Sequence, residues 1–107
     1  MALEIAYHPQ LYLGESIKSK NLDKIKKRLE KTPRFSRVFL IAISRNAHDQ
    51  LEIYHAKQLD WSYYAKYPPY VVGIAGNQRE AYALVTAIVE ECLSLRGDCE
   101  LKEYLRC

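Results

Sequence analysis

Residues 70–97 constrain the fold of this chain most, because they predict a strand, a turn and a long helix in direct succession. The apolar, β-branched run over 70–74 predicts the strand. Gly73 lies inside that strand and indicates a bulge or a close approach of another backbone. Gly76 provides the conformational freedom that the turn into the helix needs. A helix that follows a strand so directly is expected to pack back on the sheet.

The helix predicted over 77–96 has an apolar face wider than one sheet requires. Asn77 and Glu80 resemble a capping box that starts the helix, and Gly97 ends it. At 100° per residue the polar side chains span about 140°, and apolar side chains fill much of the remainder. A helix resting on one sheet needs an apolar stripe of only somewhat over ~100°. We therefore expect a second element to cover part of this helix, either the tail 99–107 or another subunit.

The remaining apolar patterns predict one more helix and three more strands. The first strand covers 3–7 and is ended by His8-Pro9. The helix covers 21–31, is capped by Asn21 and stops at Thr32-Pro33. A central strand over 38–43 is expected to be covered on both faces or nearly so, and a strand over 51–56 pairs with it in a hairpin. The order β-α-β-β-β-α predicts an α+β two-layer sandwich with a mixed four-stranded sheet, both main helices on one face and a short C-terminal element. The length of 107 residues fits a single globular domain, 1–107.

The start of the chain and its cysteines bear on its compartment. Residues 1–4 have neither the basic region nor the apolar run of a signal peptide, and no apolar stretch approaches the ~18–20 residues that cross a bilayer. Cys92, Cys99 and Cys107 form no C-x-x-C pair, and no histidine follows them at zinc-site spacing. We therefore expect a cytoplasmic protein with reduced thiols and no membrane association.

A basic segment between Lys18 and Arg37 holds most of the positive charge. It carries nine basic and two acidic residues, a net of +7, whereas the rest of the chain carries seven basic and eleven acidic residues, a net of −4. A solvated helix face accounts for such a segment, and no sequence-reading motif accompanies it. The same charges can contact phosphates electrostatically, which predicts nucleic-acid binding through Lys24, Lys27, Arg28, Lys31 and Arg34.

The glycine turn before the second helix has some features of a phosphate-binding loop. A helix start offers unpaired N–H groups, so Gly76, Asn77 and Arg79 are candidate anion-binding residues. The turn lacks the lysine and hydroxyl residues of the G-x-x-x-x-G-K-[ST] motif, and it also lacks G-x-G-x-x-G. A tight structural turn capped by its own Asn77 accounts better for the pattern.

A tyrosine-rich, proline-interrupted loop over 59–70 is the other candidate surface. Aromatic side chains of this kind are enriched at the centres of protein interfaces. The alternative is a loop folded over the sheet edge, with its rings packed on Phe39 or Ile41. Together with one ring of the second helix, the candidate interface residues are Trp61, Tyr63, Tyr64, Tyr67, Tyr70 and Tyr82.

No residue pattern predicts catalysis. His8, His48 and His55 lack metal-ligand spacing. Cys92 lies among apolar residues, where burial raises the pKa of a thiol and makes it inert. We therefore predict no catalytic residue, no metal and no cofactor.

The combined patterns predict a small cytoplasmic binding domain rather than an enzyme, self-associating as a homodimer. The wide apolar face of helix 77–96 and the loop 59–70 would supply the contact surface. Two alternatives stay open. One is electrostatic nucleic-acid binding through the basic segment 18–37, and the other is an anion or phosphate-ligand pocket, catalytic or not, over 73–79.

Overall fold

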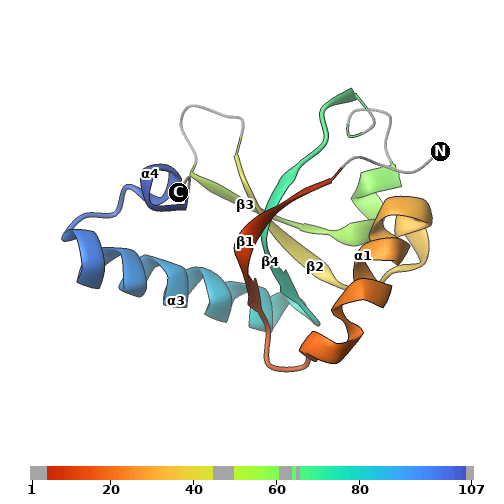
Figure 1. Cartoon of the computed structure of the whole chain (residues 1–107), viewed down its shortest axis with the longest axis horizontal. Coiled ribbons are helices and arrows are strands. Elements are labelled where there is room, and N and C mark those ends of the chain that lie inside the picture. The colour runs from red at the N-terminus through yellow and green to blue at the C-terminus, as the bar shows by residue number, and fades with distance from the viewer. Residues whose placement is uncertain (1–4, 45–49, 61–63, 65, 106–107) are drawn as a thin grey trace.

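The chain folds around one mixed four-stranded sheet (Figure 1). The computed structural model describes residues 5–44, 50–60, 64 and 66–105. Its strands and helices are β1 (Ala6–Leu13), α1 (Leu22–Lys31), β2 (Phe39–Ile43), β3 (Leu51–His55), β4 (Tyr70–Ala75), α3 (Gln78–Arg96) and α4 (Leu101–Leu105), with short 3-10 turns at Ser19–Asn21, Pro33–Phe35 and Ala56–Asp60. The predicted α+β class and order of elements are confirmed.

The strand order in the sheet is β1-β4-β2-β3. β4 runs parallel to β1 and antiparallel to β2, and β2 forms the predicted hairpin with β3. Gly73 of β4 lies between β1 and β2, where a Cβ atom would stand 3.1 Å from Cδ1 of Ile41 and 3.3 Å from the carbonyl oxygen of Tyr12. The close approach predicted at this glycine is therefore present.

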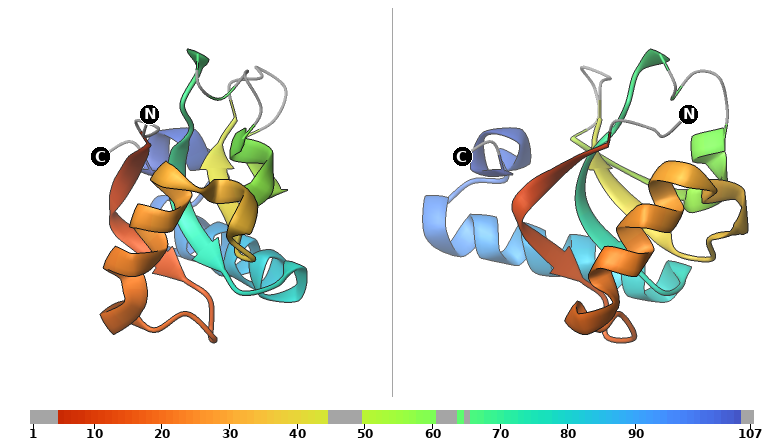
Figure 2. Two further views of the ribbon diagram at one scale, coloured as in Figure 1. Left: turned by 90° about the vertical axis from the view of Figure 1, so that its right-hand side faces the viewer. Right: turned by 45° about the vertical axis from the view of Figure 1, so that its right-hand side comes forward.

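The two main helices lie on opposite faces of the sheet, which corrects the expectation that both lie on one face (Figures 1 and 2). Leu29 of α1 belongs to a buried cluster with Leu40 of β2, whereas Ile88 of α3 belongs to a second cluster with Ile41. Consecutive strand residues point to opposite faces, so these clusters occupy opposite sides of β2. The reason is that the inner strands β2 and β4 are apolar on both faces, and each face needs its own helix.

The first strand and the first helix differ from the prediction in detail. β1 continues through Pro9 to Leu13, with a register shift against β4 between Tyr7 and Tyr12. An edge strand tolerates a proline in such an irregularity, because no ladder hydrogen bond is lost there. α1 begins directly after Asn21, but the side chain of Asn21 makes no capping hydrogen bond. Its backbone is helical, at φ −98° and ψ 0°, instead of the extended conformation that a capping residue needs.

The helix α3 starts, ends and is covered largely as predicted. Asn77 Oδ1 accepts a hydrogen bond from the Glu80 N–H at 2.9 Å, and Gly97 ends the helix at a left-handed φ of 80°. The C-terminal α4 covers part of its apolar face, because Leu101 and Leu105 are buried in the cluster of α3. Among the described residues, no helix is long and apolar enough to span a membrane.

Candidate nucleic-acid interface

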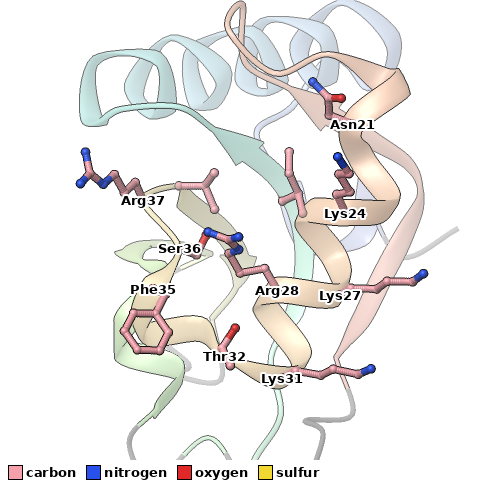
Figure 3. A pocket seen from close by; sticks show the side chains of 11 residues that line it. Asn21, Lys24, Lys27, Arg28, Lys31, Thr32, Phe35, Ser36 and Arg37 are labelled. Carbon is pink, nitrogen blue, oxygen red and sulfur yellow. The ribbon is translucent and has the colours of Figure 1, made fainter.

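A groove of about 900 Å³ lies between α1 and the segment 32–38 that follows it (Figure 3). Ile25 and Val38 are its apolar lining residues besides Phe35, and Asn21, Thr32 and Ser36 are polar. The five charged side chains that line it are all cationic: Lys24, Lys27, Arg28, Lys31 and Arg37. The groove thus combines positive charge with an apolar surface.

Neither acidic residue of the basic segment, Asp23 or Glu30, lines the groove. Glu30 of α1 accepts a hydrogen bond at 3.3 Å from the hydroxyl of Tyr7 on β1, and Lys26 lies 4.7 Å from the centre of the same ring. Burial and the Glu30 carboxylate raise the pKa of Tyr7. Within the described parts of the chain, none of the five groove cations forms an ion pair with a carboxylate. Their charge is therefore left for an external anion.

The groove cations differ in where they point (Figure 3). The guanidinium of Arg28 extends across the groove toward Ser36, whereas Lys27 and Lys31 leave α1 on the side away from Phe35. Arg28 is therefore the central cation, and Lys27 and Lys31 stand at the rim. Four of the basic residues singled out from the sequence line one groove.

The fifth predicted cation, Arg34, lies beside an exposed aromatic ring. Its guanidinium carbon is 5.0 Å from the centre of the Phe35 ring, a cation–π contact. Phe35 is 61% exposed as a residue and belongs to the groove lining. The 3-10 turn holds it there, since Pro33 and Ser36 are buried and the Ser36 N–H donates to the Pro33 carbonyl at 3.0 Å. The sequence pattern alone did not indicate Phe35 as a candidate binding residue, although it lies inside the basic segment 18–37.

The glycine turn already holds a carboxylate of the chain itself. Glu80 Oε1 accepts hydrogen bonds from the Gly76 N–H at 2.9 Å and from the Ser16 hydroxyl at 2.9 Å. These bonds lower the pKa of Glu80, with the Gly76 N–H as the largest cause. Arg79 is exposed next to this turn. An external anion at Gly76 and Asn77 would have to displace the Glu80 carboxylate. The geometry is therefore that of a structural turn held by the hydrogen bonds of Glu80.

We expect Glu80→Gln to lower the melting temperature near neutral pH, because an amide accepts hydrogen bonds less strongly than a carboxylate. The pKa of Glu80 in the folded protein lies below its usual 4.5, so its stabilisation is present above 4.5 and lost as pH falls through the lower folded-state value. Thermal unfolding from about pH 7 to about pH 3 should show the difference from wild type shrinking. Glu90→Gln, at an exposed position of the same helix, is the control. Equal losses of melting temperature in both variants would contradict a stabilising role for the hydrogen bonds of Glu80.

The candidate interface residues do not form one surface among the described residues. Tyr64 packs against the cluster under α1, with its ring 5.3 Å from that of Tyr54. Tyr70 packs against the cluster under α3, on the opposite face. Tyr67 and Tyr82 are 42% and 56% exposed. Trp61 and Tyr63 lie outside the described residues.

The two described histidines lie apart in the sheet, and Cys92 is a buried thiol. His8 and His55 lie on β1 and β3, the opposite edges of the sheet, and His48 lies outside the described residues. Cys92 is buried and donates to the carbonyl of Asp98 at 3.2 Å, and burial raises the pKa of its thiol. In the described ranges, no three His, Cys, Asp or Glu residues gather in a way that could hold a metal ion.

A hydrogen-bonded cluster that sequence analysis missed links β1, α3 and α4. Glu91 Oε1 accepts from the hydroxyl of Tyr12 at 2.6 Å and also from that of Tyr104, beside a cavity of about 310 Å³. The two bonds lower the pKa of Glu91, whereas burial and Glu91 raise that of Tyr12. These pKa values move away from neutrality, so the cluster is suited to holding elements together rather than to proton transfer. Its members are 79 and 13 residues apart, which no local pattern signals.

Comparison of the chain with models of known protein families, with curated proteins and with solved structures found no match. The groove and its charges are therefore the basis for assigning a function.

Proposed function

We propose that this protein binds nucleic acid through the groove between α1 and residues 32–38. The observation that carries the proposal is the concentration of five lining cations without an ion-paired carboxylate among the described residues. Cations that neutralise phosphates release condensed counterions, and this release supplies most of the affinity of sequence-independent binding. The described lining holds five cations against one amide, Asn21, and no carboxylate. Phosphate contacts are thus the main expected interaction.

Binding should weaken steeply with salt. For three to five phosphate contacts, the slope of log K against log salt should be about −2 to −4.5, at ~0.7–0.9 per contact. Fluorescence anisotropy of a labelled mixed-sequence oligonucleotide, starting at about 50 mM salt, measures this slope. Poly-glutamate is the control competitor, because it has negative charge without phosphates. No binding at the lowest salt, or equal competition by poly-glutamate, would refute the proposal.

Self-association as a homodimer is the second candidate function. It is favoured by the exposure of Tyr82 and Leu93, which are eleven residues apart and so lie on one side of α3. Much of the rest of the apolar face of this helix is already covered by the sheet and α4. Light scattering distinguishes the chain mass of 12.5 kDa from twice that mass.

A further inference from the structure

We infer that the groove accepts a single-stranded nucleic acid, with one base stacked on the ring of Phe35 and the phosphates on either side held by Arg28 and its neighbours. This inference rests on the proposed function and adds the strandedness of the ligand. It assigns to Phe35 a role that the charges alone do not require.

The position of the Phe35 ring allows a base to stack on it. A single exposed apolar side chain on a protein surface needs no explanation by itself. This ring, however, is part of the lining of a cationic groove, and the guanidinium of Arg34 lies 5.0 Å from its centre. Aromatic rings beside cations that track the backbone are the recurring arrangement of single-strand binding sites. Stacking is available to any base, because every base has a π-face.

The accessibility of the bases distinguishes a single strand from a duplex. In a duplex the bases are paired and stacked on one another inside the double helix, so none of them is free to lie on the Phe35 ring. A single strand can turn a base out of its own stack and into the groove.

The apolar lining supports the same choice of ligand. Ile25 and Val38 line the same groove as Arg28. Phosphate groups gain nothing from apolar side chains, whereas a base removed from water does. The combination of Ile25, Val38 and Phe35 with cations thus fits a nucleotide with its base inward and its phosphate toward Arg28. RNA and DNA share this chemistry.

The decisive experiment compares Phe35→Ala with wild type on three ligands of equal length: a single strand, a single strand with abasic positions at its centre, and a hairpin duplex. Anisotropy should show Phe35→Ala binding the single strand about 5- to 150-fold more weakly, the range for loss of one stacked base. Wild type should bind the abasic strand more weakly than the intact single strand by a similar factor. For Phe35→Ala the affinities for these two strands should differ much less. Phe35→Trp should keep the affinity of wild type, because its ring can also stack on a base. Parallel series with RNA and DNA distinguish the two sources.

Leu95→Ala is the matched control, because Leu95 is also an exposed apolar residue, at 70%, but lies on α3 across the sheet (Figure 1). Its affinity for each ligand should equal that of wild type. The inference would be wrong if Phe35→Ala bound the single strand as tightly as wild type, or if wild type bound the duplex as tightly as the single strand. The proposed function would still stand in either case if binding by wild type weakened with salt. If wild type bound none of the ligands, both would fall.

Discussion

The double variant Lys24→Glu/Arg28→Glu should bind a single-stranded oligonucleotide about 100-fold more weakly than wild type at low salt, because each lost phosphate contact costs about tenfold there. Both side chains line the groove, and Arg28 reaches across it. The slope of log K against log salt should also fall in magnitude by about 1.5, the share of two contacts. Anisotropy at several salt concentrations measures both quantities.

The control is Arg79→Glu/Arg96→Glu on α3, across the sheet from the groove. Each double variant lowers the net charge of +3 by four, to −1, so the two differ only in where the charge is changed. The exposed ion pair of Arg96 with Asp98, at 3.1 Å, contributes little to stability. If both double variants lost affinity equally, binding would follow net charge and the groove would have no special part in it.

Leu29→Ala and Ile88→Ala should each lower the free energy of unfolding by about 2–5 kcal/mol, the range for large-to-small changes of buried aliphatic residues. Both side chains are fully buried. Leu29 anchors α1 on one face of the sheet, and Ile88 anchors α3 on the other. Urea denaturation measures the losses, which should appear as lower midpoints with similar slopes.

Double-mutant cycles on the same residues test the placement of the helices. Leu29 and Leu40 share one buried cluster, so their losses should depart from additivity by about 0.5 kcal/mol or more. Leu29 and Ile88 lie in different clusters, so their losses should add within ~0.5 kcal/mol. Strong coupling of Leu29 to Ile88, with none to Leu40, would place both helices on one face.

The candidate site was only partly predictable from the sequence. The excess of cations in the basic segment is a matter of counting, and it nominated Lys24, Lys27, Arg28 and Lys31 without any structure. The groove itself depends on the turn Pro33–Phe35, which folds the chain back beside α1 and presents Phe35 to the lined space. Glu80 shows the same difference between local and long-range contacts. Its capping contact with Asn77, three residues away, was predicted from the sequence, whereas its hydrogen bond with Ser16 spans 64 residues and was not.

The amino-acid sequence by itself determined the order of elements and most of their limits, because those signals are local. Asn77 and Gly97 delimit α3 through bonds to residues three and four positions away, and the apolar run over 38–43 marks β2 within one residue. Only the tertiary structure decided that α1 and α3 cover opposite faces. An apolar pattern records which side of an element is buried, but the partner that buries it is chosen by packing between segments far apart in the chain.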